Sequence, residues 1–145
     1  MTRLGDSVSV AAAFVWLGMV LAISFLEAPL KFRASGITLP LGLGIGRLVF
    51  RALNGCEAVL AGALLVGSVL GRSPAVRLTL ATALAVVLLV LVVGLRPWLD
   101  RRAQAIIAGA NRTPSRGHGS YIVVEVVTVA LLLAAGTVVV AVAVR

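Results

Sequence analysis

The sequence has few of the residues that build metal and redox sites. Among its 145 residues there is one cysteine, Cys56, and one histidine, His118. A single cysteine excludes an intrachain disulfide and any paired-cysteine metal or redox motif. A single histidine excludes haem ligation by two histidines of one chain. We therefore predict neither a metal nor a cofactor.

Charged residues are also scarce, and acidic ones most of all. Charged residues make up 12% of the chain and hydrophobic ones 61%, and the mean hydropathy is +1.13. A soluble domain would carry about 25% charged residues. The 13 basic and 5 acidic residues give a net charge of +8. The bases flank apolar segments instead of forming one basic face, which indicates contact with anionic lipid headgroups and no nucleic-acid binding.

What the sequence has is four long apolar runs. Each is close to the roughly 20 residues that cross the hydrocarbon layer as a helix, and helices satisfy their own backbone hydrogen bonds there. We therefore predict an all-α membrane protein, a single integral membrane domain spanning residues 1–145 and folded as an antiparallel four-transmembrane-helix bundle. The predicted helices cover about 8–26, 53–70, 75–95 and 121–144.

Glycine and proline positions set the expected boundaries. The segment of about 38–52 contains Pro40 and several glycines, so we expect it at the membrane interface, becoming helical near Arg47. Pro29 lacks a backbone N–H and disfavours helix at the preceding residue, which predicts that the first helix ends near Glu27. Gly67 and Gly71 have the spacing of small residues that let helices approach closely. We expect both glycines to face a neighbouring helix.

The distribution of bases predicts the orientation in the membrane. Bases concentrate on cytoplasmic loops, so the two longer loops are predicted in the cytoplasm, with both termini outside a bacterial inner membrane. Nine bases lie in or beside the first and third loops, against four on the opposite face: Lys31, Arg33, Arg47, Arg51, Arg96, Arg101, Arg102, Arg112 and Arg116, against Arg3, Arg72, Arg77 and Arg145.

The polar residues predict one layer at the cytoplasmic face. A charged side chain within a membrane helix costs about 2.5–3.5 kcal/mol, so such residues turn inward and find partners. Tyr121, Glu125 and Thr128 share one helical face, and Arg96 can pair with Asp100 at i, i+4. The candidate ligand-binding layer consists of Glu27, Arg47, Arg51, Asn54, Glu57, Arg96, Asp100, His118, Tyr121 and Glu125.

This layer has two interpretations. It is either an ion-pair network that ties the helix ends together, or a polar pocket for a proton, a metal or a small polar ligand. Oxygen ligands from Glu27, Glu57 and Glu125, with the His118 nitrogen, would suit a metal. Against a metal, each helix offers one carboxylate and no Glu-x-x-His pair exists.

The most specific prediction concerns the ion-pair partner of Glu27. At the end of a helix its carboxylate would meet unpaired carbonyl groups and the negative end of the macrodipole. It therefore needs a basic partner. Past Pro29, Lys31 is expected to point to the headgroups, so the predicted partners are bases of other helices, namely Arg47, Arg51, Arg96 or Arg101.

Several segments together resemble a known kind of protein. The segments "WLGMVLAISFLEAPLKF", "GRLVFRALNGCE", "LRPWLDRRAQAIIAG" and "SRGHGSYIVVEV" resemble small four-helix bacterial membrane proteins of unknown function, in the transmembrane-protein-205-like neighbourhood. The resemblance implies a four-helix membrane bundle and no agreed activity. A more distant similarity, to anthrone-oxygenase-like membrane proteins, would imply oxidation chemistry.

The leading functional interpretation is a non-enzymatic integral inner-membrane protein whose charged layer binds a small ligand, a proton or a partner. One alternative is an oxidoreductase-like membrane enzyme that uses the same layer as its active site. Another is an accessory subunit of a larger membrane complex. The expected partners are the lipid bilayer with its anionic headgroups and either further copies of the chain or a larger complex.

Overall fold

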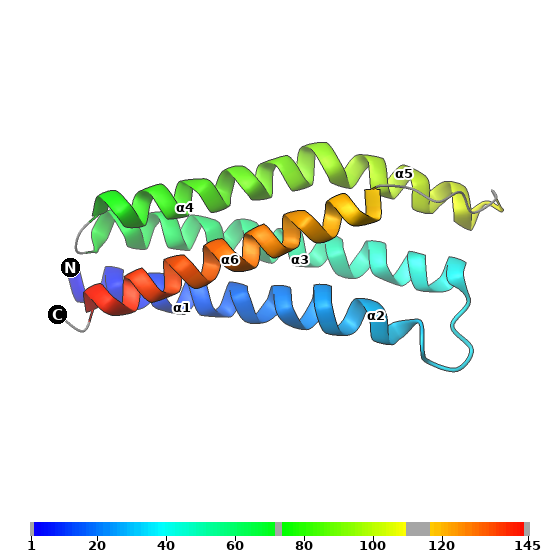
Figure 1. Cartoon of the computed structure of the whole chain (residues 1–145), viewed down its shortest axis with the longest axis horizontal. Coiled ribbons are helices and arrows are strands. Elements are labelled where there is room, and N and C mark those ends of the chain that lie inside the picture. The colour runs from blue at the N-terminus through cyan, green and yellow to red at the C-terminus, as the bar shows by residue number, and fades with distance from the viewer. Residues whose placement is uncertain (1, 72–73, 110–116, 144–145) are drawn as a thin grey trace.

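The structure, a computed structural model, describes residues 2–71, 74–109 and 117–143. Four long apolar helical segments pack as an antiparallel bundle (Figure 1), which confirms the predicted fold class. The elements are α1 (Thr2–Val20), η1 (Leu21–Glu27) and α2 (Ala28–Lys31) in the first segment, α3 (Leu39–Leu70) in the second, α4 (Pro74–Leu89), η2 (Val90–Leu95) and α5 (Arg96–Ile107) in the third, and α6 (Gly117–Ala143) in the fourth.

Each segment is long and apolar enough to cross a membrane. The candidate spans are 29, 32, 33 and 21 residues long, and a span needs about 20 residues. The protein is therefore a multi-pass membrane protein with four candidate spans. They are Arg3–Lys31, Leu39–Leu70, Ala75–Ile107 and Ile122–Val142.

The helices extend further than the sequence indicated, and the second and third segments do so most. α3 begins at Leu39 instead of near Arg47, because the hydroxyl of Thr38 caps it by accepting from the Leu41 backbone N–H at 3.4 Å. Pro40 occupies the first turn, where its missing N–H costs nothing. The third segment continues as helix to Ile107, beyond the end expected near residue 95.

A wide π-helical turn precedes a proline in two of the four segments. The Ala28 N–H donates to the Ile23 carbonyl, and the Arg96 N–H donates to the Leu91 carbonyl, each spanning five residues. Pro29 and Pro97 follow directly. A proline ring clashes with the carbonyl four residues before it, and a wide turn relieves this clash. The predicted end of the first helix near Glu27 is therefore wrong: the chain stays helical to Lys31.

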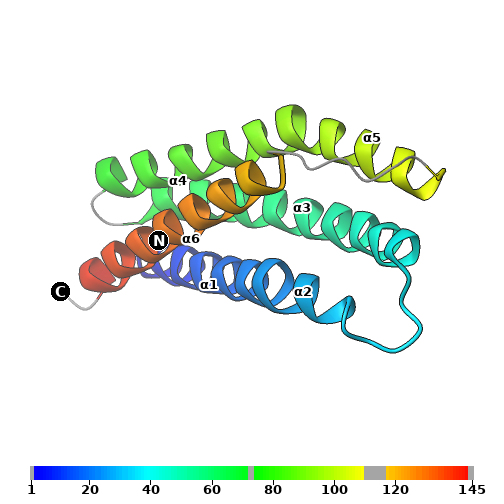
Figure 2. The ribbon, with the colours of Figure 1, turned by 45° about the vertical axis from the view of Figure 1, so that its right-hand side comes forward.

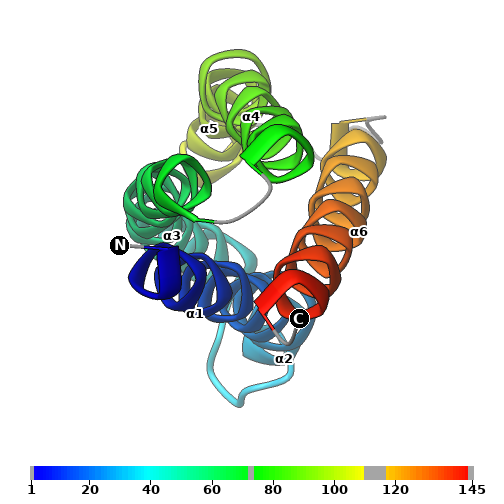
Figure 3. The ribbon, with the colours of Figure 1, turned by 90° about the vertical axis from the view of Figure 1, so that its left-hand side faces the viewer.

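The four segments form a closed ring around a common core. α1 packs against α3 and α6, and α4 packs against the same two helices from the other side (Figure 3). Large buried side chains fill the centre, among them Trp16, Leu64, Leu84 and Leu132. Many leucines and valines on the outside are exposed, which suits contact with lipid.

The two ends of the bundle differ. The start of α1 and the end of α6 lie together at one end (Figure 1), which we call the terminal end. α2, the first half of α3 and α5 lie at the other (Figure 2), which we call the α2/α5 end. The glycines of α3 allow α2 to approach there: a Cβ atom on Gly46 would lie 2.9 Å from Lys31 Nζ.

Candidate functional site

Two carboxylates are buried inside the bundle. The side chains of Glu57 on α3 and Glu125 on α6 are 1% and 2% exposed, and both lie within candidate spans. The two residues are electrostatic neighbours, and Arg96 also acts on Glu57. Because charge in a membrane span is costly, such residues are strong candidates for a functional role.

The Glu57 carboxylate is held by donors on two helices. Trp16 Nε1 donates to Glu57 Oε1 at 3.0 Å. With the Asn54 amide turned to suit its neighbours, its nitrogen donates to Glu57 Oε2 and its oxygen accepts from Arg96 Nε, both at 3.1 Å. This buried network joins α1, α3 and α5. The sequence predicted Asn54, Glu57 and Arg96 but missed Trp16. The indole N–H of a buried tryptophan needs a hydrogen-bond acceptor, and this requirement was the available signal for Trp16.

Arg96 also contacts an aromatic ring. Its guanidinium carbon lies 4.3 Å from the centroid of the Phe50 ring, within the range of a cation–π interaction. Arg96 is the first residue of α5, directly after the wide turn η2. The turn therefore sets the direction in which this guanidinium points.

Arg47 and Asp100 form an ion pair between α3 and α5. Arg47 Nε lies 3.5 Å from Asp100 Oδ1, and the two side chains are 24% and 33% exposed. The i, i+4 spacing had indicated Arg96 as the partner of Asp100. The structure gives Asp100 a partner on another helix, because α3 starts early enough to bring Arg47 alongside α5.

The predicted partners of Glu27 are wrong. Lys31 Nζ lies 3.3 Å from Glu27 Oε2, and the Lys31 side chain is only 10% exposed. The helix continues past Pro29, so positions 27 and 31 share one face. Lys31 Nζ also lies 5.7 and 5.5 Å from the ring centroids of Phe32 and Phe50. Lys31 therefore points into the bundle, and not to the headgroups as predicted.

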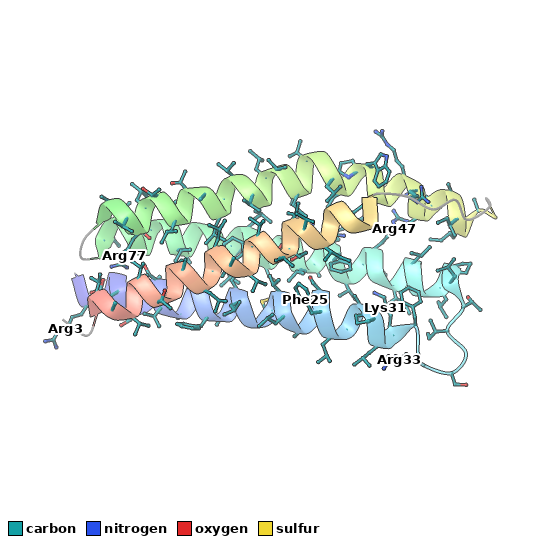
Figure 4. The ribbon with its side chains drawn as sticks, viewed as in Figure 1. Arg3, Phe25, Lys31, Arg33, Arg47 and Arg77 are labelled. Atoms are coloured by element: carbon teal, nitrogen blue, oxygen red, sulfur yellow. The ribbon has the colours of Figure 1, made fainter. Side chains whose placement is uncertain are left out.

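Several of these residues, among them Lys31, Arg47 and Arg96, border a cavity of about 540 Å³ at the α2/α5 end. Its lining is mostly apolar, with Phe25, Phe50 and Ile122 among the wall residues. In Figure 4, Lys31 and Arg47 lie toward the α2/α5 end, and Phe25 lies nearer the middle of the bundle. The charged side chains in the wall are Lys31, Arg47, Arg96, Asp100 and Glu125.

A second hollow, of about 830 Å³, runs along α3 and the third segment. We call it the groove. Its apolar part includes Gly62, Leu65 and Leu88. It shares Arg47, Arg96 and Asp100 with the cavity. The Arg47–Asp100 ion pair and Arg96 therefore form a common wall between the two hollows.

The remaining predicted residues are less central. Arg51 is exposed and borders the groove. His118 and Tyr121 lie in the first two turns of α6, but their side chains are outside the described part of the structure. Among the side chains that the structure describes, which do not include that of His118, no group of three His, Cys, Asp or Glu could hold a metal ion.

Sequence reasoning missed a second polar cluster, at the terminal end. Arg77 on α4 is 2% exposed and forms an ion pair with Asp6 on α1. One of its guanidinium nitrogens also donates to Ser9 Oγ at 2.7 Å and to the Gly67 carbonyl at 3.3 Å. Figure 4 shows Arg77 far from Lys31 and Arg47. The sequence placed Arg77 among the bases of one membrane face, whereas its side chain ties three helices together.

Comparison with known proteins identifies no relative. No protein-family model matches the chain, and neither a curated protein nor a solved structure matches it.

Proposed function

We propose that this multi-pass membrane protein binds a small amphiphilic molecule in the cavity at the α2/α5 end. The observation that carries the proposal is the cavity itself, about 540 Å³ of space inside a bundle of membrane helices. Cavities that hold small molecules in proteins measure about 300–1,000 Å³ and combine apolar walls with a few polar groups.

The lining suits a molecule with one polar and one apolar part. Phe25, Phe50 and Ile122 offer apolar surface for the apolar part. Three of the five charged side chains in the wall, those of Lys31, Arg47 and Asp100, are held by the ion pairs Glu27–Lys31 and Arg47–Asp100 before any ligand arrives. Such preorganisation reduces the entropy that binding would otherwise cost.

The groove offers such a molecule a route from the bilayer. It lies along membrane-spanning helices and includes side chains with large exposed fractions, such as Leu89 at 61%. Its common wall with the cavity consists of the side chains of Arg47, Arg96 and Asp100 alone. An amphiphile would pass from lipid to the cavity by displacing the Arg47–Asp100 pair.

The proposal follows the leading interpretation of the charged layer, which is ligand binding, and it specifies the ligand as an amphiphile. Membership in the transmembrane-protein-205-like neighbourhood stays a prediction from the quoted segments, as does assembly into a homo-oligomer or a larger membrane complex.

The orientation is a further part of the proposal. We propose that the α2/α5 end faces the cytoplasm of a bacterial cell, where exposed bases such as Arg33, Arg51 and Arg101 would contact anionic headgroups. In a Cys56→Ala background, Arg101→Cys should react with a membrane-impermeant thiol reagent only in opened cells, and Ala75→Cys should react in intact cells. The reverse pattern would overturn this orientation.

Ligand binding is tested with a neutral fluorescent amphiphile, N-phenyl-1-naphthylamine. The full chain in nanodiscs should bind it saturably after the signal of empty nanodiscs is subtracted. Ala103 is buried and lines the cavity, whereas Ala105 on the same helix is exposed and lies outside it. Ala103→Phe should therefore abolish saturable binding, and Ala105→Phe should leave it intact.

Loss of folding is distinguished from loss of binding by the helical content and thermal midpoint of each variant. If Ala103→Phe does not fold, Leu99→Phe fills the same cavity from a half-buried position. Saturable binding that survives a folded cavity-filling variant would overturn the proposal. So would the absence of saturable binding by the unmodified chain.

A further inference from the structure

One side of the groove is built from residues with little or no side chain. Gly55, Ala58 and Gly62 lie there, on α3, and all three are exposed. Apart from the neighbouring backbone of α3, no atom that the structure describes lies within 4 Å of a Cβ atom built on Gly55 or Gly62. A Cβ atom on Gly67 of the same helix would meet Ser9 Oγ at 2.5 Å. Gly67 therefore serves the packing of helices, whereas Gly55 and Gly62 leave space on the outside of the bundle.

The opposite side of the groove carries longer apolar side chains. Leu88, Leu89 and Val92 of the third segment line it there, and Leu89 is 61% exposed. The surroundings of an exposed side chain within a membrane span are lipid tails, which are as apolar as leucine. The apolar part of the groove therefore suits a hydrocarbon chain that enters from the bilayer.

Helix length places Arg51 at the level of the lipid headgroups. Arg51 and Leu70, the last residue of α3, are about 28 Å apart along the helix axis at the α-helical rise per residue. The hydrocarbon layer is about 30 Å thick, so Arg51 lies at one boundary when the terminal end lies at the other. α5 begins at Arg96 and carries several charged residues, which indicates that the third segment leaves the hydrocarbon layer at the same level.

The dimensions of the groove match one leaflet. Leu65 is the lining residue of α3 farthest from Arg51, and the two are about 21 Å apart along the helix axis. One leaflet occupies about 15 Å, half of the hydrocarbon layer. The groove therefore has room along α3 for an acyl chain and for the start of a headgroup.

Arg51 supplies charge complementarity for that headgroup. Its side chain lines the groove and is exposed, so its guanidinium can reach a group outside the protein. A guanidinium binds a phosphate through two parallel hydrogen bonds, and a base near the membrane surface attracts anionic lipid.

We infer that the groove holds one anionic phospholipid of the leaflet at the α2/α5 end, with its phosphate at Arg51 and an acyl chain along Gly55, Gly62 and Leu65. The inference goes beyond the proposed function, because it assigns a second site and a different ligand. The lipid lies on the route from the bilayer to the cavity. An amphiphile that takes this route therefore has to displace the acyl chain.

The test of headgroup recognition is native mass spectrometry of the full chain, purified free of lipid in mild detergent. The chain is titrated with phosphatidylglycerol or with phosphatidylcholine of identical acyl chains. We expect one lipid to bind saturably, with phosphatidylglycerol favoured by about fivefold, the factor that one base near an anionic headgroup supplies. Arg51→Gln should remove this preference, and Arg51→Lys should keep most of it. Arg101→Gln removes an exposed base outside the groove and should leave the preference unchanged.

The site of the acyl chain is tested by filling the groove. Ala58→Phe places a ring in the groove, whereas Ala52→Phe places the same ring at an exposed position of α3 outside both hollows. Ala58→Phe should abolish saturable lipid binding, and Ala52→Phe should leave it intact. Ala103→Phe, which fills the cavity and not the groove, should also leave it intact.

Three results would overturn the inference. The first is equal affinity for the two lipids, and the second is equal binding by the Ala58→Phe and Ala52→Phe variants. The third is a dimer with no bound lipid, which would make a second copy of the chain the occupant of the groove. Helical content and the thermal midpoint show whether each variant folds. If Ala58→Phe does not fold, the comparison of Arg51→Gln with Arg101→Gln still decides.

Discussion

The indole N–H of Trp16 donates to a carboxylate oxygen of Glu57 3.0 Å away, and neither side chain is more than 1% exposed. The bond connects α1 to α3 in the middle of the bundle and leaves the other Glu57 oxygen for the Asn54 amide. Trp16 therefore belongs both to the apolar core and to the polar network.

Replacing this donor should destabilise the bundle. Trp16→Phe keeps an aromatic ring but leaves a buried carboxylate with one donor fewer, and a hydrogen bond to a charged group contributes about 1.5–3 kcal/mol. We expect a loss of that size in the free energy of unfolding, measured by chemical denaturation in detergent. Trp98→Phe is the control, because Trp98 is 44% exposed. Equal losses in the two variants would contradict a structural role for the Trp16–Glu57 bond.

The ion pair at the terminal end should be the most sensitive single contact there. Arg77→Gln removes the ion pair with the buried Asp6 side chain, and breaking a buried pair costs about 3–5 kcal/mol. The thermal midpoint in detergent should fall strongly. Arg3→Gln removes an exposed base from the same end and should change it little. A similar midpoint for the two variants would mean that water reaches Arg77 in solution.

Two glycines of α3 should respond to alanine with opposite signs. A Cβ atom on Gly67 would lie 2.5 Å from Ser9 Oγ and 2.9 Å from the Gly5 carbonyl oxygen, whereas one on Gly62 would meet nothing within 4 Å. Gly67→Ala should therefore destabilise the protein. Gly62→Ala should stabilise it by up to about 1 kcal/mol, the helix-propensity difference between the two residues. Thermal unfolding of both variants checks this, and stabilisation by Gly67→Ala would show that α1 does not pack closely there.

Removing the charge of Glu27 and removing the charge of Lys31 should have similar effects on stability. The two side chains pair with each other at 3.3 Å, so removing either charge breaks the same contact. Glu27→Gln and Lys31→Gln should lower the thermal midpoint by similar amounts, and the double variant should cost less than the sum. A much larger effect of Glu27→Gln would instead indicate a basic partner on another helix, as the sequence had suggested.

The sequence predicts the four spans and part of the site for simple physical reasons. Long apolar runs have few alternatives to membrane helices, and carboxylates within them must turn inward. This reasoning identified Glu57 and Glu125, both of which are buried. Asn54, one turn before Glu57, belonged to the same predicted layer.

The missed features depend on packing between distant segments. Arg77 was counted as a membrane-flanking base, because nothing local shows that Asp6, on another helix, lies beside it. The Glu27 partner was missed because Pro29 was expected to end the helix. A wide turn before the proline instead keeps the helix intact and brings Lys31 onto the same face.

The two wide turns also change how the helical faces should be counted. Each spans five residues where an α-helical turn spans four, and one residue corresponds to a rotation of about 100° in an α-helix. A single helical wheel drawn through residues 2–31 or 74–107 therefore assigns the wrong outward direction to one half of each segment. In a related chain that lacks one residue between 21 and 27, the wide turn would have to become an ordinary α-helical turn. Only then would α2 keep the same face toward the bundle. A one-residue gap at this place in an alignment would then mark a conserved fold and not a divergent one.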